Sequence, residues 1–150
     1  MIDITNESGR QADEEGLVAL ATFALDKLRI HPSADLSILL VDEETMEAYH
    51  RRFMDLDGPT DVLSFPMDEL RAPAEGQERP AGVLGDIVLC PAVTEAQAAE
   101  NGRTPTGEAE YLLIHGLLHL LGHDHAEPEE KRVMFGLNDQ IIAAWQEHAR

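Results

Sequence analysis

Histidines are concentrated in one short stretch of the chain, residues 110–125 (EYLLIHGLLHLLGHDH). His115 and His119 lie four residues apart in a leucine-rich segment that is typical of a helix. At that spacing both side chains lie on one helix face, with their Cβ atoms about 5–6 Å apart. Two imidazole nitrogens can therefore meet one metal ion at Zn–N distances of about 2.0–2.1 Å.

The third ligand is chosen between two further histidines. His123 continues the four-residue spacing, but on a straight helix it would lie about 12 Å along the axis from His115. On a continued helix His125 would be rotated by about 240°. Gly122, however, is a residue type at which helices commonly end. A chain that turns back there brings His125 to the ion, so we predict a zinc site of His115, His119 and His125 with one position open, the catalytic pattern.

The same histidine spacing occurs in metzincin zinc proteases, which makes proteolysis an alternative. Those enzymes carry a glutamate directly after the first histidine as general base. Gly116 occupies that position here, so a protease of this kind would lack its proton acceptor. A zinc-dependent protease or another metal hydrolase is therefore the second hypothesis.

The elements that would position the histidines are indicated by apolar periodicity and turn residues. Strands are predicted at residues 1–5, 35–41, 62–65 and 82–90, and helices at residues 11–30, 43–53, 91–101, 106–121 and 127–147. A length of 150 residues suits one domain. We expect a single α+β domain over residues 1–150, with one mixed sheet of about four strands packed with helices. The metal site should lie at the end of a helix in the C-terminal half.

Several residues mark the ends of these elements. Asp42 is the expected N-cap of the helix at 43–53, and Gly102 is expected to end the helix that Pro91 begins. The helix at 11–30 should end at His31-Pro32, because a residue before proline avoids helical dihedrals. Residues 68–81, rich in proline and glycine, predict an exposed loop.

The chain is strongly acidic, with 29 acidic against 11 basic residues and a net charge of -18. Phosphate binding depends on clustered lysine and arginine, so this charge argues against broad, sequence-independent binding to nucleic acid. A local cationic site made of a few arginines and a metal ion stays compatible with it.

Cys90 is the one cysteine, which excludes an internal disulfide and a cysteine-built zinc site. We expect it to be a small buried side chain. No apolar run approaches the roughly 20 residues of a membrane span, and the N-terminus MIDITNESGR lacks the basic and apolar regions of a secretory signal. A cytoplasmic protein without a membrane segment is expected.

Three motifs resemble those of the YbeY endoribonuclease family. HGLLHLLGHDH (115–125) resembles the family signature HGxLHLxGYDH, with His123 in the place of the usual aromatic residue. PTDVLSFP (59–66) is similar to a second motif, and GDIVLC (85–90), followed by a helix containing Gln97, to a third. They occur in family order, and the similarity extends from about Leu36 to Ile142.

The resemblance implies an α+β domain with zinc held by His115, His119 and His125. It implies a single-strand endoribonuclease that acts in ribosomal RNA processing, at the 3′ end of 16S rRNA, and in ribosome quality control. RNA would be the main partner, with ribosomal proteins or a ribosome-associated GTPase as further partners. A third hypothesis is a ribosome-associated binding module whose zinc is structural.

One departure from the family concerns RNA binding. Many members carry an arginine five positions before the proline of PTDVLSFP, and here that position is Met54. Arg51 and Arg52 lie nearby on the same predicted helix, and we interpret them as substitutes that bind substrate. The alternative is that both belong to an exposed helix surface.

Four further polar residues are candidates for the site. Asp124 is placed to orient a ligand histidine through its second ring nitrogen, or else forms a turn. Ser64 and Asp61 are expected to line the cleft, with Ser64 a candidate for substrate binding; otherwise Asp61 caps a turn and Ser64 faces solvent. Asp86 lies in an apolar strand, where a carboxylate should have a partner.

The mechanism that these residues suggest is metal-assisted hydrolysis. Zinc bound to three neutral imidazoles lowers the pKa of a water to about 7. The ion would also offset negative charge that develops on a phosphodiester oxygen.

Overall fold

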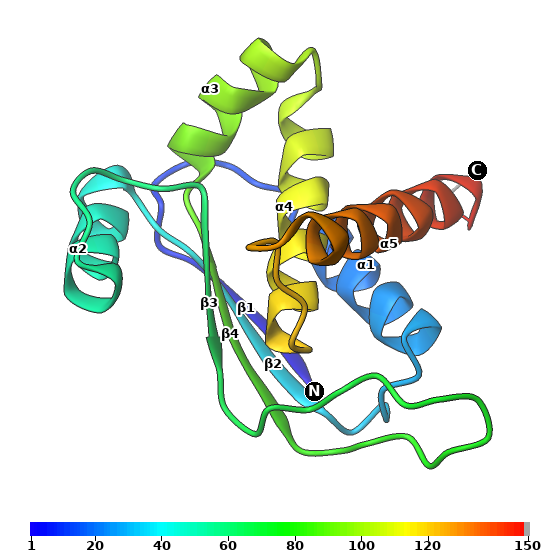
Figure 1. Ribbon diagram of the computed structural model, residues 1–150. Coiled ribbons are helices and arrows are strands. Elements are labelled where there is room, and N and C mark those ends of the chain that lie inside the picture. The colour runs from blue at the N-terminus through cyan, green and yellow to red at the C-terminus, as the bar shows by residue number, and fades with distance from the viewer. Residues whose placement is uncertain (149–150) are drawn as a thin grey trace.

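A four-stranded mixed sheet lies at the centre of the computed structural model, which describes residues 1–148 (Figure 1). The strands are β1 (Ile2–Asn6), β2 (Asp35–Leu40), β3 (Val62–Pro66) and β4 (Val83–Leu89), in the order β1-β2-β4-β3. The first three in that order run parallel, and β3 pairs with β4 in the antiparallel direction. The predicted mixed sheet and the α+β class are confirmed.

Within the described residues five helices accompany the sheet: α1 (Glu14–Lys27), α2 (Glu43–Met54), α3 (Pro91–Asn101), α4 (Pro105–Leu120) and α5 (Pro128–His148). Figure 1 shows α1, α4 and α5 together on one face of the sheet, while α2 lies beside the edge formed by β3. None of the helices in the described part of the chain is both long and apolar enough to cross a membrane.

Local capping explains most helix ends. The side chain of Asp42 accepts a hydrogen bond from the backbone of Thr45, as expected of an N-cap, and Gly102 ends α3 in the left-handed conformation. The first helix is shorter than the predicted 11–30. It begins after Asp13, whose side chain accepts a hydrogen bond from the backbone N–H of Gly16. It ends at Lys27, because Arg29 already has a positive φ of 63°.

The hydrophobic core lies between the sheet and the three helices on its face. α4 is its central element, and most of its apolar side chains are buried, as expected for a helix covered on nearly all sides. They are Leu112, Leu113, Ile114, Leu117, Leu118 and Leu120. Cys90 is fully buried, as predicted for a small apolar side chain.

The opposite face of the sheet carries polar side chains beside a smaller apolar cluster that packs with α2. Asp86 is exposed there beside Asp3 and Ser37. The expectation that Asp86 needs a partner inside an apolar strand is therefore wrong. Side chains alternate between the faces of a strand, so Asp86 points away from the helices while its neighbour Ile87 is buried.

The long connection between β3 and β4 is the predicted exposed loop at 68–81. It extends along the bottom of the view in Figure 1 and passes close to the C-terminal end of α4. The side chain of Arg71 touches the chain at Gly122. The loop therefore reaches the end of the helix that carries the histidines.

Candidate metal centre

Three histidines converge at the C-terminal end of α4. One ring nitrogen from each of His115, His119 and His125 lies within 4.8 Å of the other two. The Nε2 atoms of His115 and His119 are 3.2 Å apart, and the ring of His125 lies 5.4 Å and 5.3 Å from theirs between centroids. A group of three imidazole nitrogens at these separations can hold one metal ion. This is the set that the sequence predicted.

The turn at Gly122 produces this convergence. Gly122 has a φ of 93°, and its N–H donates to the carbonyl of His119 at 3.0 Å. The N–H of His123 donates to the carbonyl of Leu118, also at 3.0 Å. This pair of bonds is the Schellman motif, which ends a helix with a left-handed glycine. The chain reverses there and returns His125, and not His123, to the group.

The tautomer of His119 follows from one hydrogen bond. Its Nδ1 lies 2.9 Å from the carbonyl oxygen of His123. A carbonyl oxygen only accepts, so Nδ1 must carry the proton and the lone pair lies on Nε2, which faces the group. Asp124 has a different contact, since its Oδ1 accepts from the backbone N–H of His125 at 2.7 Å. The backbone of His123 therefore orients His119, a role that residue types alone do not reveal.

The surroundings favour neutral imidazoles. Burial, followed by the charges of His119 and His125, lowers the pKa of His115 to about 4. Burial is also the main cause of the lowered pKa of His119. Metals bind the neutral form of histidine, so these two side chains are in the metal-binding state at neutral pH.

The histidines open into a cleft of about 410 Å³ between α4, β3 and the end of α2. Its other walls come from the segment at 61–66 and from Met54. Asp61 and Ser64 line it as predicted, and Asp61 is the one carboxylate among the lining residues. Its Oδ1 accepts from the N–H of Val62 at 2.7 Å, and its charge raises the pKa of His115, against the effect of burial.

Gly116 is a point of close contact between α4 and the sheet. A Cβ at this position would lie 3.0 Å from Ile87 Cγ2, 3.1 Å from Ser64 Oγ and 3.2 Å from Val62 Cγ2. Ser64 donates its hydroxyl to the carbonyl of Gly116 at 2.9 Å, so the alternative of a solvent-facing Ser64 is wrong. The glutamate of metzincins has no room here, because the sheet occupies that space.

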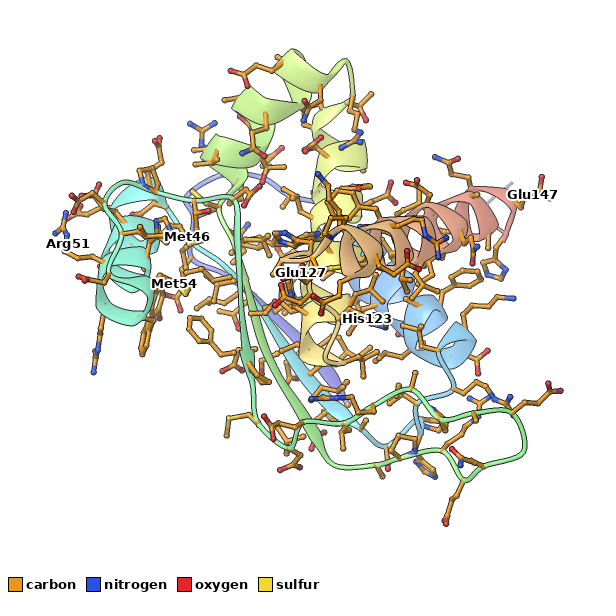
Figure 2. All side chains as sticks on the ribbon, in the orientation of Figure 1. Met46, Arg51, Met54, His123, Glu127 and Glu147 are labelled. Carbon is orange, nitrogen blue, oxygen red and sulfur yellow. The ribbon has the colours of Figure 1, made fainter. Side chains whose placement is uncertain are left out.

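The two predicted arginines lie outside the cleft lining. Arg51 forms ion pairs with Glu47 and, at 3.5 Å, with Asp57. The guanidinium of Arg52 lies 5.3 Å from the ring centre of Phe53. In Figure 2 Met54 lies on the side of α2 that faces β3, whereas Arg51 points away from it. Met54 therefore forms the wall at which an arginine was expected from the resemblance.

Two further side chains reach the site from distant segments, and the sequence patterns indicated neither. The Phe135 ring of α5 lies 6.1 Å from the His115 ring and 6.0 Å from the His125 ring, between centroids. Arg71 lies against Gly122, where an added Cβ would collide with its side chain. After burial, the charge of Arg71 is the second cause of the lowered pKa of His123. Spatial proximity alone identifies these two residues.

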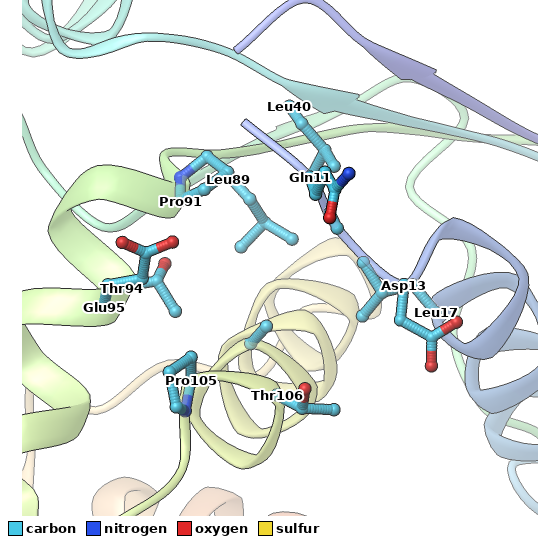
Figure 3. Close-up of a pocket in the computed structure, with 12 residues that line it drawn as sticks. Gln11, Asp13, Leu17, Leu40, Leu89, Pro91, Thr94, Glu95, Pro105 and Thr106 are labelled. Atoms are coloured by element: carbon cyan, nitrogen blue, oxygen red, sulfur yellow. The ribbon is translucent and has the colours of Figure 1, made fainter. Parts of the chain in front are cut away.

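A second, smaller cavity of about 80 Å³ lies among the N-terminal ends of α1, α3 and α4 (Figure 3). Three of its polar side chains already have partners. Asp13 caps α1, Thr94 donates to the carbonyl of Cys90, and Glu95 forms an ion pair with Arg10. The cavity has the features of a packing void, so the chemistry points to the histidine cleft.

The family models and the curated relatives give the same family. The family described as Endoribonuclease YbeY matches residues 3–146. A Cutibacterium acnes protein named Endoribonuclease YbeY is 79% identical over 148 residues, 99% of this chain and 96% of that protein. A Thermobifida fusca protein of the same name is 55% identical and spans 97% of this chain and 94% of its own length.

The fold also has a counterpart among solved structures. The solution structure of a Thermotoga maritima protein superposes with a TM-score of 0.61 at 25% identity. The match covers 99% of this chain and 93% of that one. The likeness therefore extends over the whole arrangement of sheet and helices that positions the cleft.

Proposed function

Because the chain belongs to the YbeY endoribonuclease family, we propose that it hydrolyses phosphodiester bonds in RNA at the histidine cleft. The convergence of His115, His119 and His125 in an open cleft carries this proposal. The two most similar relatives reported above share more than half of their residues with this chain and carry that activity in their names. Residues 1–150 are proposed to act as one catalytic domain.

We further propose that the cofactor is one zinc ion. The donor set supports this choice, since three imidazole nitrogens are typical of catalytic zinc sites, and His119 already presents the unprotonated Nε2 to the group. Zinc at this site would supply Lewis-acid chemistry, acidifying water and offsetting charge on a phosphodiester. Other transition metals also bind imidazoles, so metal identity is part of the test.

Polar residues of the cleft have separate proposed roles. Asp61 is placed to accept a proton from the attacking group, because it is the carboxylate in the cleft and raises the pKa of nearby His115. Ser64 is proposed to contact substrate at the cleft wall as a hydrogen-bond acceptor, since its hydroxyl proton is already donated to the carbonyl of Gly116. Asp124 supports the turn that presents His125.

The proposed substrate is single-stranded ribosomal RNA, with the 3′ end of 16S rRNA as the processing site and ribosome quality control as the wider role. Ribosomal proteins or a ribosome-associated GTPase are proposed partners, and the cytoplasm is the proposed location. Arg51 and Arg52 remain proposed contacts for RNA outside the cleft, where both are exposed.

The test is cleavage of a labelled, unstructured RNA by the purified protein with one equivalent of zinc. We expect wild type to cleave it and His115→Ala to lose cleavage. His31→Ala is the matched control, because His31 contacts Ser33 in a turn outside the cleft and should leave activity intact. A precursor of 16S rRNA extended at the 3′ end then tests the site of processing.

Two other outcomes would support the alternatives. Cleavage of a peptide library with RNA untouched would indicate another metal hydrolase, although no side chain fits at Gly116 in the role of the metzincin base. Unfolding on zinc removal, without turnover of either substrate, would indicate a binding module with structural zinc.

A further inference from the structure

The wall of the cleft formed by α2 is apolar. Met54 is the last residue of α2, lines the cleft with the three histidines and is 55% exposed. The sequence resemblance gave an arginine at this position, so a thioether stands where a cation would contact phosphate. A cleft of about 410 Å³ has the size of a site for one small organic group such as a nucleotide.

The aromatic side chains near Met54 turn to the other face of the sheet, where Phe53 and Phe65 line a separate cavity with Asp86. Phe53 precedes Met54 and is 50% exposed, so one part of its ring is open to solvent. The rest of the ring is held in place by Phe65, at 5.1 Å in an edge-on arrangement, and by Tyr49, stacked at 6.0 Å. Phe53 is therefore held on that other face, and Met54 is the residue of α2 that lines the histidine cleft.

The nearby cations do not change the character of this wall. Arg51 is held by Glu47 and Asp57, and Arg52 lies over the ring of Phe53. Neither lines the cleft. A phosphate at the histidines would therefore be attracted by the metal site, whereas the group next to it would meet the thioether of Met54.

We propose that Met54 contacts the unpaired base of the nucleotide adjacent to the cleaved phosphate. The proposal rests on the proposed endoribonuclease function. Every base offers an aromatic face, and the thioether of methionine makes favourable contacts with aromatic rings, so such a contact needs no strict base sequence. At this wall the chain recognises a base where an arginine would recognise a phosphate.

The experiment compares kinetics on two RNA substrates with the zinc-loaded protein. One is an unstructured oligonucleotide whose main cleavage position has been mapped. The other has the same sequence with abasic riboses on both sides of that position. Met54→Ala should raise KM on the first by roughly five- to tenfold with kcat changed less than threefold, and should leave KM on the abasic RNA unchanged.

Two further variants sharpen the result. Met67→Ala is the matched control, because Met67 is 63% exposed but does not line the cleft, and it should leave both KM values unchanged. Met54→Arg should restore a phosphate contact and steepen the plot of log KM against log salt by about 0.7, the value for one phosphate in a single strand.

Each contrary outcome has a definite meaning. Wild-type cleavage with an unaltered KM in Met54→Ala would overturn the base contact alone and leave the apolar wall to protein docking. An equal rise of KM on both RNAs would also overturn it, because the loss would not involve the base. A wild type that cleaves no RNA would overturn the proposed function together with this inference.

Discussion

The Nδ1–H of His119 donates to the carbonyl oxygen of His123 across 2.9 Å. This bond joins the last turn of α4 to the reversal that follows it, and it sets the tautomer of His119 with Nε2 free. Orientation of a ligand histidine by a backbone carbonyl is common at metal sites. His123 thus contributes its backbone to the site, while its side chain stays outside the histidine group.

Metal content should separate the two neighbouring histidines. We expect His125→Ala to lose bound zinc, because one of three imidazole donors disappears. His123→Ala should retain about one zinc per chain, since alanine keeps the carbonyl that orients His119. Mass spectrometry of the purified variants after zinc loading measures this. Zinc loss in His123→Ala with retention in His125→Ala would reverse the ligand assignment.

Substitution of Gly122 should weaken metal binding as well as stability. Gly122 has a φ of 93°, which strains any residue with a Cβ, and the added Cβ of Gly122→Ala would collide with the side chain of Arg71. The substitution therefore strains the turn that holds the carbonyl of His123. We expect a loss of about 1–2 kcal/mol in unfolding free energy and about tenfold weaker zinc binding. Chemical unfolding and competition with a chromophoric chelator measure the two effects.

Gly102→Ala is the matched control for this substitution. It has a φ of 67° and nothing within 4 Å of an added Cβ. Gly102→Ala should lower the free energy of unfolding through backbone strain and leave the zinc affinity unchanged. Equal zinc affinities in the two variants would show that the turn at Gly122 does not tune the site.

Close packing at Gly116 gives a stability prediction. Gly116→Ala puts a methyl group 3.0 Å from Ile87 Cγ2 and pushes α4 from the sheet. We expect a net destabilisation of about 1–3 kcal/mol, typical of overpacking. Gly136→Ala in α5 meets nothing within 4 Å and should stabilise by about 0.5–1 kcal/mol through helix propensity. Urea unfolding measures the free energy of unfolding of both variants. Stabilisation by both substitutions would contradict the close contact between Gly116 and the sheet.

The stability of the metal-free protein should fall in mild acid. The folded-state pKa of His115 is about 4, below its ordinary 6.5, so between these values the unfolded chain binds a proton that the folded chain does not. Stability is therefore full above pH 6.5 and is lost as the pH falls toward 4. The lowered pKa of His119 acts in the same direction.

Urea unfolding with chelator present, at several pH values from 7 to 4, measures this dependence. His115→Asn should show a shallower decline of unfolding free energy than wild type over the same range. His31→Asn, a change of the same type outside the cleft, should leave the slope as it is in wild type. Parallel curves for wild type and His115→Asn would contradict the prediction.

Removal of the Asp61 charge should affect turnover more than binding. Asp61→Asn keeps the acceptor for the N–H of Val62 but cannot take up a proton at neutral pH. We expect kcat on RNA to fall by about 10²–10⁴-fold, the usual contribution of a general base, with zinc content unchanged. Asp139→Asn on the exposed side of α5 is the control. A kcat within twofold of wild type would remove Asp61 from the mechanism.

The sequence by itself determined the histidine group, because the relevant signals are local. Two histidines four apart share a helix face by helical geometry, and Gly122 ends the helix where a left-handed residue is needed. Strands, helices and their caps were similarly readable from short-range periodicity. The first helix was overestimated, since the apolar periodicity reaches Leu28 and does not reveal that Arg29 turns the chain.

The tertiary structure decided what surrounds the histidines. The pairing of β3 with β4, and the packing of α4 on both at Gly116, bring Asp61 and Ser64 to the cleft wall. They also place Met54 there in preference to Arg51 or Arg52. The hydrogen bond between Ser64 and Gly116, for example, joins residues 52 positions apart in the chain. Their strand register and helix position depend on burial of the whole core, so no local pattern encodes them.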